Sequence, residues 1–135
     1  SSNDNPWKSF NINKPIFLNT LTSLDDTQGF WINALQNITL VVRGRSSITP
    51  VFKLKQGFNL IGYQSLISNT PDFVFGNITS SINAVYAFNA STGNFEIYIP
   101  GVAGNLNFIR PGLGYWVNAN QNVTWLFDGE RYIMA

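Results

Sequence analysis

The feature that most constrains this chain is a duplication of its own sequence. GFWINALQNIT at residues 29–39 aligns with GYWVNANQNVT at residues 114–124, an offset of 114 − 29 = 85 residues. The same offset, without any gap, pairs further residues of similar kind: Phe10 with Phe95, Ile12 with Ile97, Pro15 with Pro100, Leu21 with Leu106, Leu24 with Ile109 and Gly44 with Gly129. Such self-similarity predicts a fold assembled from related units.

The two related segments flank a stretch that occurs once. We call residues 10–44 the first B segment, residues 51–94 the A segment, and residues 95–129 the second B segment, B′. At 135 residues we expect one domain, 1–135, made of B, A and B′. Either both B segments share the A segment, or the first B segment is the second half of a preceding unit in a longer array.

Charge and composition narrow the classes of partner. Charged residues make up 11% of the chain, and eight basic residues nearly balance seven acidic ones. They occur singly, so we expect no basic surface for nucleic acid or anionic lipid. The apolar runs are also much shorter than the roughly 20 residues that span a bilayer, so we expect no membrane insertion.

Short runs of β-forming residues separated by turn formers predict an all-β fold. The clearest is a hairpin, with strands at 84–88 and 95–99 around the turn 89–94. We expect further hairpins from 51–54 and 58–63 around 55–57, and from 115–118 and 123–127 around 119–122, with the latter repeated at 30–33 and 38–42. The prediction is a sandwich or barrel of short antiparallel strands.

One segment departs from the strand pattern. Pro71 follows Thr70 as at a helix start, and Val74, Ile78 and Ile82 keep a spacing of four residues. We therefore expect one short helix near residues 71–82.

The motifs around these strands resemble a known family. LKQGFNLIGY at residues 54–63, AVY at 84–86 and RPGLGYWV at 110–117 are similar to the "GWNLVGYP … PGxGYWV" tandem β-repeat modules of secreted and cell-surface proteins of archaea and bacteria. Phe58 stands where the pattern has Trp, and Gln64 where it has Pro. The resemblance implies surface-layer-like or adhesin-like regions without catalysis, and it supplies no catalytic residue.

The residue inventory limits enzymatic chemistry. The chain has no His and no Cys, so triads with those residues, imidazole bases, disulfides and His- or Cys-based metal sites are excluded. Acid–base work would fall to single carboxylates, and Asp25–Asp26 suits a turn better than a calcium loop. The glycines of residues 110–114 precede a strand, so they are turn glycines and do not cradle a phosphate. We expect no enzyme activity, no cofactor and no metal.

The aromatic residues have two interpretations. Because Phe30 and Trp31 align with Tyr115 and Trp116, we expect these four to belong to a repeated structural core. Trp7 and Trp125 lack an aromatic counterpart in the other copy, and are therefore the candidates for stacking against a ligand such as a sugar ring.

Four triplets fit the acceptor pattern for N-glycosylation, which suits a secreted glycoprotein. They begin at Asn37, Asn77, Asn89 and Asn122. The alternative is that Asn serves as a turn residue at these positions.

These observations favour an extracellular or cell-surface protein. We expect a non-catalytic structural or adhesive module of a surface protein, surface layer or filament, whose partners are other surface-protein subunits and which self-associates by strand exchange. The alternative is a carbohydrate-binding accessory module of a secreted hydrolase, which predicts an exposed row of aromatic residues. A small enzyme would instead need two facing carboxylates.

Overall fold

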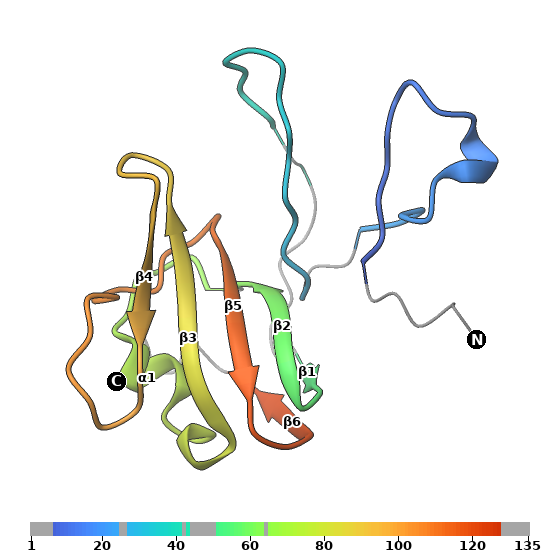
Figure 1. Ribbon diagram of the computed structural model, residues 1–135. Helices are drawn as coiled ribbons and strands as arrows, with labels where there is room; N and C mark the ends of the chain where they lie inside the picture. The colour runs from blue at the N-terminus through green and yellow to red at the C-terminus, as the bar shows by residue number, and fades with distance from the viewer. Residues whose placement is uncertain (1–6, 25–26, 42, 44–50, 64, 128–135) are drawn as a thin grey trace.

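Two antiparallel sheets form the body of the molecule. The computed structural model describes residues 7–24, 27–41, 43, 51–63 and 65–127. One sheet has the strand order β2-β5-β3-β4, and the other pairs β1 with β6 (Figure 1). The strands are β1 (Val51–Leu54), β2 (Gly57–Gly62), β3 (Ile82–Asn89), β4 (Asn94–Tyr98), β5 (Gly114–Ala119) and β6 (Val123–Leu126). This architecture confirms the predicted all-β class.

The predicted hairpin of residues 84–99 is confirmed. β3 pairs with β4 with Val85 opposite Tyr98 and Asn89 opposite Asn94. Gly93 has a φ of 72° in the connecting turn, a conformation that glycine adopts without steric cost. Local turn chemistry therefore brings these two strands together.

The other two predicted hairpins are wrong, although their strands exist. β1 pairs with β6 and β2 pairs with β5, so each of the two short connections passes from one sheet to the other. Together the four strands form a ribbon that bends at residues 55–56 and 120–122. Gly57 turns the corner with a φ of 101°.

The side chain of Asn59 fixes this corner. Its Oδ1 accepts a hydrogen bond from the backbone N–H of Lys55, and its Nδ2 donates to the carbonyl oxygens of Lys55, Gly57 and Val117. Across the corner, the N–H of Gln56 donates to the Oδ1 of Asn122. These bonds satisfy backbone groups that leave the ladder where the ribbon bends.

The helix is shorter than predicted. α1 spans Pro71–Phe75, with Thr70 as N-cap accepting a bond from the N–H of Phe73, and a 3-10 turn, η2, follows at Thr79–Ser81. Gly76 and Asn77 are weak helix formers and end the α-helix after Phe75. The spacing that predicted a longer helix instead reflects burial, because Val74, Ile78 and Ile82 are all buried.

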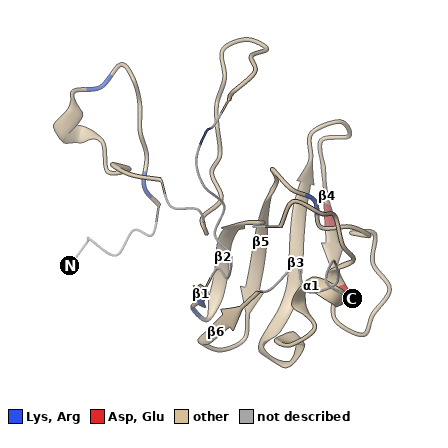
Figure 2. Ribbon diagram, turned by 180° about the vertical axis from the view of Figure 1, so that it is seen from behind, with Lys and Arg blue, Asp and Glu red and all other residues tan. Residues whose placement is uncertain are grey.

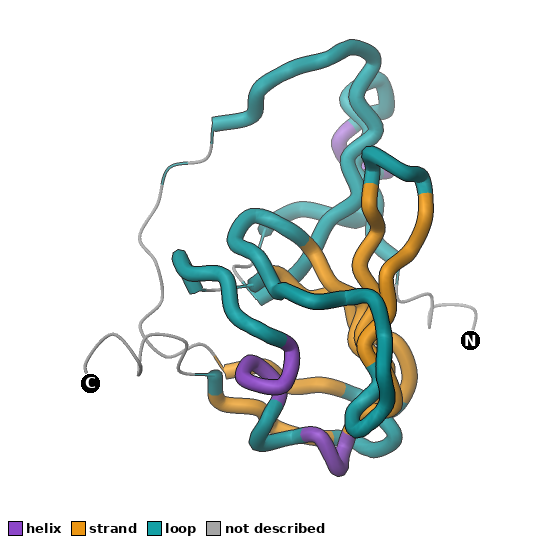
Figure 3. Tube along the Cα trace, turned by 90° about the vertical axis from the view of Figure 1, so that its left-hand side faces the viewer, coloured by secondary structure: helices purple, strands orange, loops and turns teal. Residues whose placement is uncertain are grey.

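The core lies between the two sheets and under α1, which covers the same side of the larger sheet as β1 and β6 (Figure 3). Trp125 is 1% exposed, and its ring centroid lies 4.7 Å from Phe52 and 5.0 Å from Phe75. All buried members of this core come from residues 52–127, which cover the A segment and B′.

The first B segment does not share the conformation of B′. No described residue of it lies in a strand; it contains a 3-10 turn, η1 (Ile16–Leu18), and one isolated bridge, Gln28 with Ile61. The strands expected at 30–33 and 38–42 are therefore absent among the described residues. β5 already occupies the position between β2 and β3 that an equivalent strand would take. We call residues 7–24 and 27–41 the arm, which projects from the sandwich (Figure 1).

Candidate interaction surface

The face of the larger sheet that points away from the core is apolar. Alternation along the strands puts Ile61, Val85, Tyr98 and Val117 inside, and their neighbours along each strand outside. Asn118 of β5 also points outward, and we call the apolar outside residues the outer face: Phe58, Leu60, Tyr86, Phe88, Phe95, Ile97 and Trp116. A solvated sheet face is ordinarily polar, so this one is suited to contact.

The rings of the outer face contact one another across the strands. Phe58 lies 6.0 Å from Tyr86 and 6.3 Å from Trp116, measured between ring centroids, and Phe88 lies 5.2 Å from Phe95. Phe58 is 62% exposed and Phe95 51% exposed. None of the seven residues is charged, and the charged residues of the described chain are few and scattered (Figure 2).

Two tryptophans of the arm contact this face. Trp7 packs edge-on against Trp116 with 5.3 Å between ring centroids, and Trp31 lies 5.6 Å from Phe88. Between them the backbone of residues 27–29 bonds to the edge of β2: the N–H of Gly29 donates to the carbonyl of Leu60 and that of Gly62 to the carbonyl of Thr27. The outer face therefore already accepts indole rings.

The ligand-stacking prediction is wrong for Trp125. Its ring is buried among Phe52, Phe75 and Phe127, so no ligand reaches it. Its Nε1 has no hydrogen-bond partner among the described residues. Trp7, the other candidate, is 57% exposed and lies on the outer face.

The four residues expected to form a repeated core do not share one environment. Tyr115 is 1% exposed and Trp116 half-buried, whereas Phe30 and Trp31 are 37% and 57% exposed. The core prediction is therefore wrong for Phe30 and Trp31. They lack the flanking strands that β2 and β3 provide for β5.

The four glycosylation candidates differ in how their amides are used. Asn37 is exposed on the arm. Asn77 donates through Nδ2 to the carbonyl of Leu126, and Asn89 donates to Glu96. Asn122 is exposed and uses its Oδ1 to accept from Gln56. Because a glycan replaces a hydrogen on Nδ2, Asn37 and Asn122 accommodate one with the least rearrangement.

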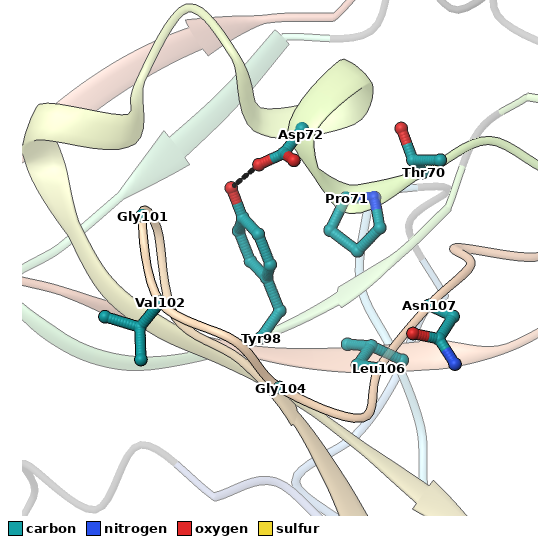
Figure 4. Close-up of a pocket in the computed structure, with 9 residues that line it drawn as sticks. All are labelled: Thr70, Pro71, Asp72, Tyr98, Gly101, Val102, Gly104, Leu106 and Asn107. Carbon is teal, nitrogen blue, oxygen red and sulfur yellow. Dashed lines mark hydrogen bonds between the residues drawn. The ribbon is translucent and has the colours of Figure 1, made fainter.

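A shallow pocket beside α1 holds a carboxylate and a phenol. Its volume is about 320 Å³, and Tyr98 donates a hydrogen bond of 2.7 Å to Oδ1 of Asp72 within it (Figure 4). Burial, followed by this bond and the nearby negative charge, raises the pKa of Tyr98 to about 12. The remaining lining is Pro, Gly, Val, Leu, Thr and Asn, with no second carboxylate among the described residues. The pocket therefore lacks the pair of carboxylates that a glycoside hydrolase would need.

The motif residues have architectural roles. The hydroxyl of Tyr115 accepts a 2.7 Å bond from the N–H of Arg110 and so holds the loop 110–114, where Gly112 has a φ of 80°. Burial is the main cause that raises the pKa of Tyr115. The hydroxyl of Tyr63 donates to the carbonyl of Ile67. As expected from sequence, these loop glycines lead into a strand, β5. Asp25 and Asp26 lie outside the described residues.

Sequence reasoning did not identify Phe58, Tyr86, Phe88 and Phe95 as surface residues. The alternation of side chains along a strand could have indicated that they share a face, because Tyr86 and Phe88 are two positions apart on β3 and lie on the same side. Which side faces solvent depends on where β1, β6 and α1 pack, and that is set by contacts distant in sequence.

We find no matching family model, no matching curated protein and no matching solved structure for this chain. Among the described residues, no helix has the length and apolar character needed to cross a bilayer.

Proposed function

We propose that this chain is a non-catalytic extracellular module with a structural and adhesive role in a cell-surface protein, surface layer or filament. The observation that carries the proposal is the outer face, a set of seven contiguous uncharged residues, five of them aromatic, on one side of a sheet. Exposed apolar surfaces of this kind are typical of protein–protein contact.

The use of the family-like motifs supports this proposal. Gly57, Asn59, Gly112 and Tyr115 hold corners and loops of the sandwich. The motif residues that resemble the repeat family thus stabilise the fold, as expected for a structural module.

Localisation tests the cellular part of this proposal. Antibodies against the sandwich are applied to intact cells of the native source before and after treatment with an external protease. We expect surface labelling that the protease removes, together with ordered lattices or filaments by negative-stain microscopy. Labelling that appears only after lysis would overturn the proposal.

Association of the purified chain tests the contact surface. We expect the double variant Phe58→Ser, Phe95→Ser to lower the average molecular mass of the particles in solution at high protein concentration, measured by light scattering, because both rings lie on the outer face. The matched control is Leu66→Ser, because Leu66 is 74% exposed but lies in the loop after β2. An equal effect of both changes would remove the outer face from the proposal.

A second candidate is a carbohydrate-binding accessory module of a secreted hydrolase. It is favoured by the cluster of Phe58, Tyr86 and Trp116, because flat rings beside an amide such as that of Asn118 suit the apolar face of a sugar. Pull-down on insoluble polysaccharides tests it. Retention that Trp116→Ala abolishes would support this candidate, and no retention on any polysaccharide would dismiss it.

A further inference from the structure

The arm presents apolar side chains that the sandwich does not cover. Leu24 is 70% exposed, Ile32 65%, Leu40 64% and Leu35 99%. The arm itself projects from the sandwich, apart from the contacts described above (Figure 1). Exposed apolar side chains gathered on one segment are typical of a surface that contacts a partner.

Three of the arm's exposed apolar residues fall at positions that are core positions in B′. At the offset of 85 residues, Leu24 aligns with Ile109, Ile32 with Val117 and Leu40 with Trp125. Those three B′ residues are 1% exposed or less. In B′ they are buried against β1, β2, β3 and α1, which all belong to the A segment. The arm therefore carries the core of a sandwich without the A-type strands that would cover it.

A local part of the B′ structure is already present in the arm. In B′, the N–H of Ile97 donates to the Oδ1 of Asn105, and the carbonyl of Ile97 accepts from the N–H groups of Asn105 and Leu106. In the arm, the N–H of Ser9 donates to the Oγ1 of Thr20, and its carbonyl accepts from Thr20 and Leu21.

Thr20 and Leu21 are the sequence equivalents of Asn105 and Leu106, while Ser9 lies three positions before the equivalent of Ile97. The arm thus makes the same three hydrogen bonds with one partner shifted by three residues, as expected where no β3 fixes the register.

We infer that the arm is a binding element for a second A-type segment, one with the strand and helix pattern of residues 51–94. On binding, residues 29–34 and 38–41 become strands in the places that β5 and β6 hold in B′. The A segment of this chain, residues 51–94, already pairs its strands with those of B′. The partner of the arm is therefore a further A-type segment. This inference deepens the proposed structural role, because it names the partner of an assembling module.

A fusion tests the inference. An additional copy of residues 51–94 is joined directly to residue 10, as residue 94 is joined to residue 95 in the chain, and limited proteolysis is followed by mass spectrometry. We expect cleavage within residues 30–41 to slow by at least roughly tenfold relative to the parent chain, because proteases cleave the open state. Equal cleavage of fusion and parent would overturn the inference.

Two neighbouring substitutions in the fusion provide a matched pair. Ile32→Asp places a charge where Val117 is fully buried, whereas Asn33→Asp changes the half-buried outward position equivalent to Asn118. Protection is expected to be lost with Ile32→Asp and kept with Asn33→Asp. Because Ile32 is exposed in the parent, the sandwich of residues 51–127 stays folded in both variants.

The parent chain at increasing concentration distinguishes the sources of the A-type segment. Protection of the arm together with a dimer mass means that a second copy supplies it by exchange, and protection in the fusion alone means that a separate A-type segment is needed. These readouts do not depend on where the protein resides, so the inference and the proposed function fail separately.

Discussion

The phenol of Tyr98 donates a 2.7 Å hydrogen bond to Oδ1 of Asp72 and thereby ties β4 to the first turn of α1. The pKa of Tyr98, about 12, lies above its ordinary value of 10.0. The folded protein therefore holds the phenolic proton more tightly than the unfolded chain does. The stability linked to this proton, which comes first from burial of the phenol and then from the bond to Asp72, is fully present below about pH 10 and is lost as the pH rises toward about 12.

We expect Tyr98→Phe to reduce the alkaline loss of stability, measured as the urea midpoint at neutral pH and between about pH 10 and 12. Asp72→Asn should bring the pKa of Tyr98 only part of the way down, because burial is the largest cause of its elevation. An unchanged slope in Tyr98→Phe would contradict the assignment. Tyr115, whose pKa is also raised, accounts for part of the remaining slope.

The corner bonds of Asn59 predict a large cost for a small deletion. Asn59→Ala leaves the backbone groups of Lys55, Gly57 and Val117 without the side chain that pairs with them. We expect a loss of about 2–3 kcal/mol in the free energy of unfolding by urea denaturation. Asn83→Ala, which removes one exposed amide contact to Asn118, should stay within about 0.5 kcal/mol.

Trp125 is predicted to be a stability residue with no role in ligand contact. Trp125→Ala should cost about 3–5 kcal/mol, because it opens a cavity beside Phe52 and Phe75. Trp125→Phe should cost less, since it keeps a ring and removes an Nε1–H that has no partner among the described residues.

The neighbouring Leu126, 61% exposed, is the control for this substitution. Leu126→Ala is expected to change the unfolding free energy by less than about 0.5 kcal/mol. Equal midpoints for Trp125→Ala and Leu126→Ala would place the indole outside the core.

The two glycines of the loop 110–114 are expected to differ. Gly112 has a φ of 80°, so Gly112→Ala should cost about 1–2 kcal/mol in strain. A Cβ on Gly114 would meet its nearest atoms at 3.6 Å, an ordinary contact, so Gly114→Ala should lie within about 0.5 kcal/mol. Thermal unfolding of both variants measures the difference, and equal losses would contradict it.

How far the sequence predicts this fold depends on the distance between the residues that decide it. The turn 89–94 decides the β3–β4 hairpin locally, and Thr70 with Pro71 decides the start of α1. The corners at 55–56 and 120–122 have similar turn composition, but their strands pair with partners between 114 − 62 = 52 and 126 − 51 = 75 residues away. The amino-acid composition of such a short connection does not show whether its two strands pair with each other or continue into different sheets.

The candidate surface was harder to predict than the fold. Alternation divides Trp116 from Tyr115 and Trp125 from Leu126, yet only the packing of one sheet on the other decides which member is buried. The duplication also misled the prediction for Phe30 and Trp31. The aligned residues of the two B segments have different environments because the A segment occurs once and its strands pair with those of B′.

The pairing of β1 with β6 has a mechanical consequence. Val51, the first residue of β1, lies opposite Leu126, the last residue of β6. A tension applied between these two points would separate the strands one hydrogen bond at a time, as in unzipping, and not by shearing all the bonds at once. A module built this way extends under low force, so in a row of such modules it would act as a compliant link.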